Sequence, residues 1–298
     1  MSETIASLQH KLNGARDLHT VVRTMKAVAA ASIGQYERSI LALADYNRTI
    51  ELGLGVLFRD EKIRPPIHHP PKASHYGAVV FGSDQGLVGQ FNDVVAEFAI
   101  KKISVISKHA KIWTVGARVQ ERLQDVALPL VRSFPIPSSI TAITPLVGTI
   151  LIDYENLQSR GEVSELSLFY NRPTSGANYA PVIQKILPLD QEWCNRLAKN
   201  SWPTKNLPEV LGRTSASLRG FLHEYLFVSL FRACADSLAS ENASRLAAMQ
   251  RAEKNIDELL QDLNSKARQL RQGEIDEELF DVISSFEALH TKSYKQGD

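Results

Sequence analysis

The stretch LAAMQRAEKNIDELLQDLNSKARQL, Leu246–Leu270, places apolar residues at alternating steps of three and four. Its seam holds Leu246, Met249, Ile256, Leu260, Leu263, Ala267 and Leu270, and only Glu253 interrupts it. This spacing keeps one stripe of a helix apolar and is typical of a coiled coil. Because no proline follows Pro208, the pattern predicts a helix of about eighty residues, against about three turns in an average globular helix. Its apolar stripe must be buried by a second helix or by another protein.

The N-terminal segment carries the matching pattern and has no proline before Pro65. Its seam holds Ile5, Leu8, Leu12, Ala15, Val22, Ala29, Ile33, Tyr36, Ile40 and Leu43. His19 and Lys26 fall on the same seam, where polar residues cost stability but fix register or mark where the seam leaves its partner. A helix of fifty to sixty residues would be roughly 80–90 Å long, well past the diameter of a small domain. The economical arrangement is a long antiparallel two-helix coiled coil formed by the N- and C-terminal helices.

Between the two helices the pattern changes to α/β. Asp60–His75, with four prolines, is predicted to be a linker loop whose three histidines are solvated. Strands are predicted at YGAVVF (76–81), KIWTVG (111–116), LVRSF (130–134) and EVSELSLFY (162–170), and helices at Asn92–Lys102, Ala117–Asp125 and Thr144–Ser159. Alternating strands and helices favour a Rossmann-like α/β domain with a mostly parallel or mixed sheet. Leu187–Glu209 is predicted to be irregular and to return toward the C-terminal helix. The expected division is 1–64, 65–209 and 210–298.

The bulk composition excludes several classes of protein. A net charge of +1 gives no global attraction for nucleic acid or for an anionic membrane. Cys194 and Cys234 make neither a disulfide framework nor a metal-ligand spacing, and they predict reduced thiols in a cytosolic protein. The N-terminus MSETIASLQHKL resembles neither a secretory signal nor a mitochondrial presequence, and no apolar run has the length needed to span a bilayer. Any membrane association is therefore expected to occur through a partner.

The stretch FGSDQGLVGQFN, Phe81–Asn92, is the best candidate for a binding site, because a glycine-rich turn between a strand and a helix can hold a phosphate. Its glycines are spaced one residue too widely at the first gap for the dinucleotide fingerprint. Asp84 would also place a carboxylate where a phosphate should sit. The alternative is structural: Gly86 and Gly89 permit a sharp turn and close helix packing, and Asp84 or Ser83 caps backbone N–H groups. No GxSxG, HExxH, CxxC or GxxxxGK[ST] motif occurs, so we predict no catalytic residue, cofactor or metal site.

Several blocks resemble the gamma subunit family of F-type ATP synthases, the central rotor shaft. TMKAVAA (24–30) is similar to the family's MxMVAA block, SDQGLVGQFN (83–92) to its SDxGLCGxxN turn, and GEVSELSLFYNRPTS (161–175) to its strand ending in YNxFxS. SLASENASRLAAMQRAEKNIDELLQDL (237–263) resembles its pattern of Ser-Glu, Arg, Ala-Met, Asn and spaced leucines, and RQGEIDEEL (271–279) resembles its RQxxITxEL. These blocks cover almost the whole chain in the family's order.

The resemblance implies a part that turns and does not itself catalyse. In the family the two terminal helices form a coiled coil that enters the hexamer of alpha and beta subunits, and the α/β domain lies near the epsilon subunit and the c-ring. The expected function is therefore to couple ion flow through the c-ring to ATP synthesis or hydrolysis by rotation. The expected location is peripheral, through the c-ring, at the cytoplasmic face of a bacterial or archaeal plasma membrane, with no nucleic-acid partner.

By motif position, the resemblance assigns partner-interface and coupling roles to Met25, Lys26, Arg245, Met249, Arg271, Gln272, Asp276 and Glu278. Lys26 and Arg271 are the expected partners of the family's acidic beta-subunit loop. Without the resemblance, each charged residue is equally well explained as a solvated position on a helix face.

This chain also departs from the family's pattern. Ser32, Ile33 and Gly34 replace a basic cluster, and Val88 and Gln90 replace the usual cysteine and small residue. Asp276 replaces the usual threonine, the tip carries Phe286 and Glu287 instead of small residues, and Glu274–Glu287 holds six acids and no base. An apolar sleeve would have to accommodate that charge. The departures suggest a divergent branch, such as the alternate, sodium-pumping F-type ATPases.

Two other classes of function remain open from the sequence. An enzyme that uses FGSDQGLVGQFN as a cofactor turn would bind nucleotide and turn over alone. A static coiled-coil adaptor would bind its partners without dependence on ATP. Co-purification with alpha-, beta- and c-type subunits distinguishes the rotor from both.

Overall fold

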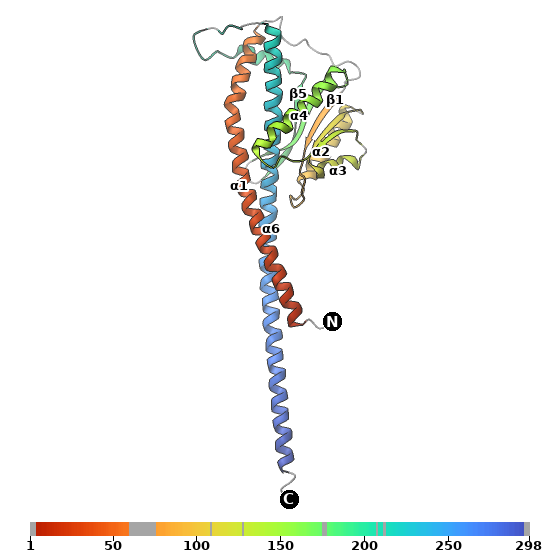
Figure 1. Cartoon of the computed structure of the whole chain (residues 1–298), viewed down its shortest axis with the longest axis vertical. Coiled ribbons are helices and arrows are strands. Elements are labelled where there is room, and N and C mark those ends of the chain that lie inside the picture. The colour runs from red at the N-terminus through yellow and green to blue at the C-terminus, as the bar shows by residue number, and fades with distance from the viewer. Residues whose placement is uncertain are drawn as a thin grey trace. The chain divides into compact units, whose positions relative to one another are not determined.

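The structure, a computed structural model, describes residues 4–59, 76–107, 109–126, 128–174, 178–206, 208–210 and 213–294, with side chains as far as residue 284. The two long helices expected from the seams are α1 (Ile5–Phe58) and α6 (Thr214–Tyr294), drawn in Figure 1 in red to orange and in cyan to blue. The predicted linker 60–75, with its histidines, and the side chains of Phe286 and Glu287 lie outside the described residues. The chain forms two compact units, one of residues up to Ala27 and from Met249 onward, the other of Val28–Ala248.

In the first unit, α1 and α6 run antiparallel. Leu8, Leu12 and Ala15 are buried against Leu263, and Leu260, Ala267 and Leu270 pack around them. The order along α1 is reversed along α6, because His19 pairs with Asp257 and Lys26 pairs with Glu253. The predicted antiparallel helix pair is therefore confirmed.

In the second unit, a five-stranded sheet has the order β3-β2-β1-β4-β5. The strands are β1 (Tyr76–Phe81), β2 (Lys111–Val115), β3 (Leu130–Phe134), β4 (Glu165–Pro173) and β5 (Tyr179–Leu187). The first four are parallel, and β5 is antiparallel to β4. The four predicted strands are present and the mixed α/β class is confirmed.

Sequence reasoning missed strand β5. It is an edge strand, only one of its residues is fully buried, and it contains Pro181, which lowers the strand signal. Proline is tolerated there because an edge strand can leave one side of its backbone without ladder hydrogen bonds.

Helices cover both faces of the sheet. The strand β1 is buried on both faces, as is usual for a parallel strand between helices: Val79 and Phe81 face one core, and Ala78 and Val80 face the other. The first core includes residues of α4 (Ile140–Ser159) and α6, and the second includes residues of α2 (Phe91–Ile106) and α3 (Ala117–Gln124). In this unit the sheet is thus a layer between α2 with α3 on one face and α4 with α6 on the other (Figure 1).

The prediction that Leu187–Glu209 is irregular is wrong for α5 (Gln191–Lys199), whose N-cap Asp190 accepts a hydrogen bond from the backbone N–H of Glu192. Only nine residues long and bounded by prolines, this helix gives a weak periodic signal in the sequence. The expected return toward the C-terminal helix is confirmed, since the Trp193 ring lies 4.8 Å from that of Tyr225 on α6.

The division at residues 64 and 209 stays a prediction. Residue 64 lies outside the described residues, and the compact units are bounded instead within α1 and α6.

Candidate functional site

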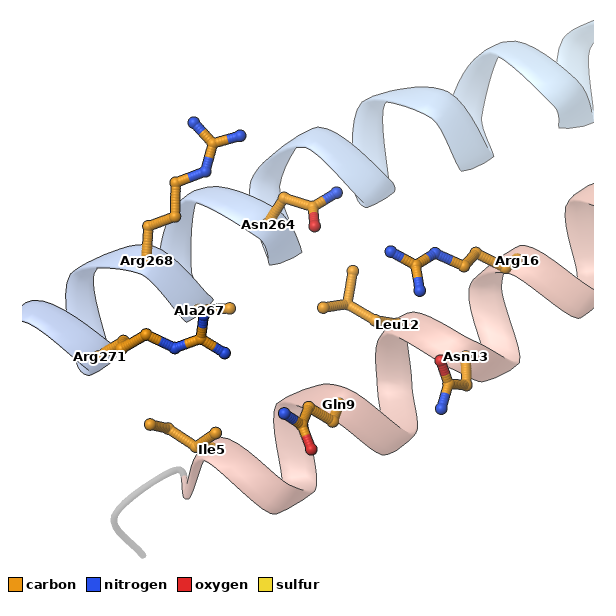
Figure 2. A pocket seen from close by; sticks show the side chains of 9 residues that line it. All are labelled: Ile5, Gln9, Leu12, Asn13, Arg16, Asn264, Ala267, Arg268 and Arg271. Carbon is orange, nitrogen blue, oxygen red and sulfur yellow. The ribbon is translucent and has the colours of Figure 1, made fainter.

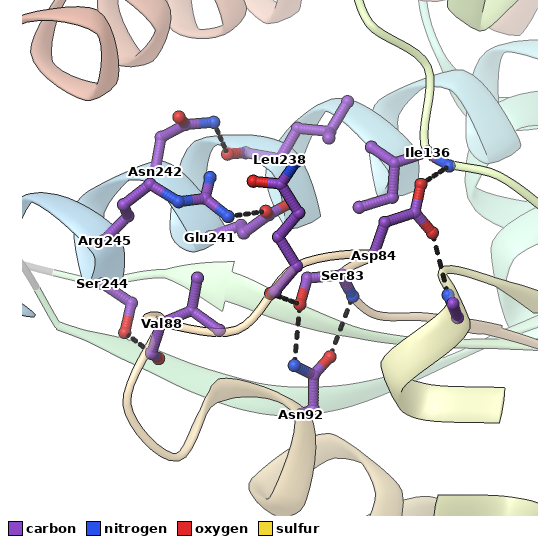
Figure 3. Close-up of polar contacts among 12 residues, drawn as sticks. Ser83, Asp84, Val88, Asn92, Ile136, Leu238, Glu241, Asn242, Ser244 and Arg245 are labelled. Carbon is purple, nitrogen blue, oxygen red and sulfur yellow. Dashed lines mark hydrogen bonds and ion pairs between the residues drawn. The ribbon is translucent and has the colours of Figure 1, made fainter. Parts of the chain in front are cut away.

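Polar groups of the glycine-rich turn after β1 form hydrogen bonds with neighbouring parts of the fold. The Asp84 carboxylate accepts the backbone N–H of Ala117, the first residue of α3, and that of Ile136, both at 2.8 Å (Figure 3). The Ser83 N–H donates to the Asn92 Oδ1 at 2.8 Å, and the Asn92 amide donates to the Ser83 Oγ at 2.7 Å. Asp84 therefore is the expected capping residue, but it caps α3 and not the helix that follows the turn.

The glycines of this turn divide their roles differently from the prediction. A Cβ at Gly82 would lie 2.4 Å from the Val119 Cβ, so Gly82 is the glycine that allows close helix packing. Gly89 adopts a φ of +57°, which glycine tolerates best, so its part in the turn agrees with the prediction. Gly86 has no atom within 4 Å of the Cβ position and no positive φ, so nothing in the structure requires a glycine there.

The polar interruptions of the two seams pair with each other across the helix pair of the first unit. The Lys26 ammonium forms an ion pair with the Glu253 carboxylate, and both side chains are partly buried, at 32% and 20% exposed. His19 Nε2 lies 3.3 Å from an Asp257 carboxylate oxygen. Because an ion pair needs both partners opposite each other, these contacts allow one register of the helices and oppose others.

A cavity of about 470 Å³ opens between α1 and α6 in the same unit. Its polar lining consists of arginines and amides: Arg16, Arg268, Arg271, Gln9, Asn13 and Asn264 (Figure 2). In Figure 2 the Arg16 and Arg271 side chains extend into the space between the helices, and Arg268 points outward from its rim. Ala267, a seam residue with a small side chain, also lines the cavity.

This cavity carries positive charge that the described residues do not neutralise. No carboxylate lines it, and within the described part of the chain no ion pair involves Arg16, Arg268 or Arg271. Other cations of this unit do have partners, for example Lys266 with Asp262 at 2.7 Å. The cavity can therefore receive carboxylate groups, with which guanidinium groups form charge-assisted hydrogen bonds.

The remaining predicted coupling residues are scattered. Arg245 donates from Nη2 to the Glu241 Oε1 at 2.7 Å inside the second unit. Met249 is buried and Met25 is half-buried, whereas Gln272, Asp276 and Glu278 are exposed on α6. Among the predicted residues, the structure brings Lys26 to Glu253 and Arg271 to the arginine cavity.

Two arginines of the cavity were missed by sequence reasoning. Arg16 and Arg268 each follow a small seam residue, Ala15 and Ala267, by one position. Charged residues that flank a coiled-coil seam commonly reach across it, and this signal could have found them.

Comparison with known proteins agrees with the two-helix and sheet architecture. The family model described as "ATP synthase" matches residues 4–289. The chain belongs to the ATP synthase family.

Curated relatives are ATP synthase gamma chains at low identity. That of Anaeromyxobacter sp. (strain Fw109-5) is 25% identical, over 96% of this chain and 99% of its own length, and that of Clostridium pasteurianum is 24% identical, over 97% and 99%. Among solved structures, the chain is similar to one in the Euglena gracilis mitochondrial ATP synthase, OSCP/F1/c-ring, in rotational state 3. That match has a TM-score of 0.63 and 17% identity, and covers 97% of this chain and 95% of the other. A match to the rotor of the same enzyme in rotational state 1 has a TM-score of 0.60 and 18% identity, covering 91% and 98%.

The expected resemblance is therefore confirmed. The chain is a central-stalk subunit of the gamma type, a class that is non-catalytic within its complex. No helix among the described residues is both long and apolar enough to cross a membrane. Within the same residues, no three or more His, Cys, Asp or Glu side chains are grouped to hold a metal ion.

Proposed function

We propose that this chain is the rotor of an ion-translocating ATP synthase. It turns inside a hexamer of alpha and beta subunits and joins that hexamer, together with an epsilon-type subunit, to a c-ring in the membrane. The observation that carries the proposal is the family match over residues 4–289, which covers the helix pair and the whole sheet domain.

The shaft acts through its asymmetry. Three chemically identical catalytic sites around one helix pair meet different faces of it, so each rotational angle favours a different nucleotide occupancy. Coupling of this kind is reciprocal, because a nucleotide that prefers one angle also drives the shaft toward that angle. Rotation driven by ion flow then drives ATP synthesis, and ATP hydrolysis drives rotation in the opposite direction.

The eight residues to which the resemblance assigns coupling roles are not equally available in the structure for contact with a partner subunit. Arg271 supports the proposal best, because its guanidinium lies in a cavity with no carboxylate lining. Lys26 is already paired with Glu253, so we assign it to helix register instead of contact with an acidic loop of a beta subunit. Arg245 is likewise paired with Glu241 and is assigned an internal role.

The coupled ion is the open part of the proposal. We place the chain peripheral to the cytoplasmic face of a bacterial or archaeal plasma membrane, as part of a proton-coupled or a sodium-coupled complex. A sodium-coupled complex is the second candidate, supported by departures from the family's pattern such as Asp276 in place of the usual threonine.

Co-purification tests the proposal. A tagged chain expressed in its native host should co-purify with alpha-, beta- and c-type subunits, and the purified complex should have ATPase activity. In vesicles, ATP-driven transport measured with sodium and with protons in turn identifies the ion. If the tagged chain recovers none of these subunits, the rotor proposal is wrong; if the purified chain alone hydrolyses nucleotide, it is an enzyme.

A further inference from the structure

In the second unit, one face of α6 is polar although it is buried. Ser237, Ser240, Glu241 and Ser244 follow one another at steps of three and one and are 2%, 1%, 4% and 8% exposed. The preceding turns bury apolar residues such as Leu230 and Ala233 in the main core. Burial of a hydroxyl costs free energy unless the hydroxyl finds a hydrogen-bond partner, and Ser240 and Ser244 find theirs in the α/β domain.

Two of these serines donate to backbone carbonyls of the α/β domain. The Ser244 Oγ donates to the carbonyl oxygen of Val88, in the glycine-rich turn, at 2.6 Å (Figure 3). The Ser240 Oγ donates to the carbonyl oxygen of Asn171, on β4, at 3.0 Å. We call these two serines and the two carbonyls they contact the serine clamp.

The clamp reaches two segments at one edge of the sheet. The turn at Val88 follows the carboxyl end of β1, and Asn171 lies near the carboxyl end of β4, which is parallel to β1. The Asn171 side chain joins the two, because its amide donates to the carbonyl oxygen of Phe91 at 2.9 Å.

Hydrogen bonds resist rotation in a way that apolar contacts do not. The hydrophobic effect is non-directional, so an apolar helix face loses little when it turns by a few degrees against its neighbour. A hydrogen bond weakens steeply as its angle departs from linear. Two such bonds one turn apart on α6 therefore hold the angle of the helix against the sheet.

From this geometry we propose that Ser240 and Ser244 are positioning residues that fix the angle of the α/β domain relative to α6. Torque is then transmitted between the domain and the helix with little relative rotation of the two. This inference rests on the proposed rotor function and adds the residues through which the two parts of the rotor are joined. It also gives the glycine-rich turn a role, since the turn presents the Val88 carbonyl to the helix.

The chain provides a matched control for the test. Ser237 is on the same polar face and is also buried, but its hydroxyl has no hydrogen-bond partner within the described residues. Ser237→Ala therefore removes a buried hydroxyl without removing a clamp bond. Ser240→Ala and Ser244→Ala each remove one clamp bond by the same change of side chain.

The experiment measures angular stiffness in the assembled complex. A probe is attached to the α/β domain, the hexamer is fixed to a surface, and the angular variance of the probe is recorded during pauses between ATP-driven steps. The double variant Ser240→Ala/Ser244→Ala should widen the variance about twofold at unchanged ATPase activity, while Ser237→Ala keeps the wild-type value. Equal variance in the double variant, or equal widening in the control, overturns the proposal. A wild-type complex that does not rotate would instead contradict the rotor function itself.

A second measurement applies if the double variant does not assemble. In the purified full chain, hydrogen exchange of the Phe91 amide reports the turn, because this amide donates to the same Val88 carbonyl at 3.3 Å. Ser244→Ala should lower its protection about threefold to tenfold, the range for loss of one hydrogen bond. Ser237→Ala should not change it, and unchanged protection in Ser244→Ala also contradicts the proposal.

Discussion

Lys26 on α1 and Glu253 on α6 form an ion pair, and Glu253 is the one polar interruption of its own seam. Lys26 is one of two interruptions of the facing seam, and the other, His19, pairs with Asp257. The polar positions that weaken each helix separately thus become the contacts that align the two. Such pairs specify register more than they stabilise, because desolvation of the charges offsets much of their attraction.

Lys26→Met should therefore lower the melting temperature of the helix pair, because it leaves the Glu253 carboxylate beside an apolar seam. Adding Glu253→Leu should restore or raise the melting temperature, by about a few degrees, because two apolar residues then complete the seam. Thermal unfolding followed by circular dichroism measures both. Lys254→Met is the control, since Lys254 forms an exposed pair with Glu258 at 3.9 Å, and it should change nothing. A double variant less stable than the single one would contradict the assignment.

The same pair predicts a dependence of stability on pH. The hydrogen bond from Lys26 holds the pKa of Glu253 below its usual range, so the pair stabilises the folded chain above the unfolded-state pKa of Glu253. That contribution is lost as the pH falls through the lower folded-state pKa. Nuclear magnetic resonance titration of the Glu253 carboxyl should give a pKa below that of an exposed glutamate, and Lys26→Met should raise that pKa. An ordinary pKa for Glu253 in the wild-type chain would show that the ion pair does not form in solution.

Arg271→Ala should lower the coupling of ATP hydrolysis to rotation by about fivefold to tenfold while the complex still assembles, within the range of coupling energies between linked sites. Arg16→Ala should act in the same direction, because Arg16 lines the same cavity. The measurements are ions transported per ATP hydrolysed and the yield of assembled complex. Arg251→Ala should have little effect, because Arg251 is exposed on α6 like Arg271 but does not line the cavity. Equal losses of assembly and coupling for Arg271→Ala would contradict a coupling role.

Gly82→Ala should destabilise the α/β domain by about 1–3 kcal/mol, because the added methyl group overlaps Val119 in a packed core. Gly86→Ala, in the same turn, should cost little, since no atom lies within 4 Å of its Cβ position. Urea unfolding of the two variants compares them. Equal destabilisation would indicate that the turn, and not the helix contact, requires both glycines.

Cys194 and Cys234 should react slowly with thiol reagents in the folded chain and rapidly in denaturant. Both are buried, and burial raises the pKa of the Cys234 thiol well above its usual range, so little of the reactive thiolate is present. Timed alkylation with mass spectrometry measures this, and rapid native labelling would show that the helix core opens easily.

The sequence by itself determined the two long helices, the four central strands and the family. Those features depend on local periodicity and on blocks of residues that need no knowledge of the fold, such as the seam from Leu246 to Leu270. It gave only weak signals for α5 and β5, because a nine-residue helix and an edge strand containing Pro181 are stabilised mainly by their neighbours.

Tertiary structure alone decided which residues act together. Lys26 and Glu253 are 227 positions apart, and only the antiparallel packing makes two separate interruptions into one ion pair. Arg16 and Arg271 come to line one cavity in the same way, and the Ser244 hydroxyl reaches the Val88 carbonyl across 156 positions. Periodicity shows which face of a helix is buried. The role of a buried charge or hydroxyl depends on the partner that compensates its loss of water, and only the tertiary fold brings that partner to it.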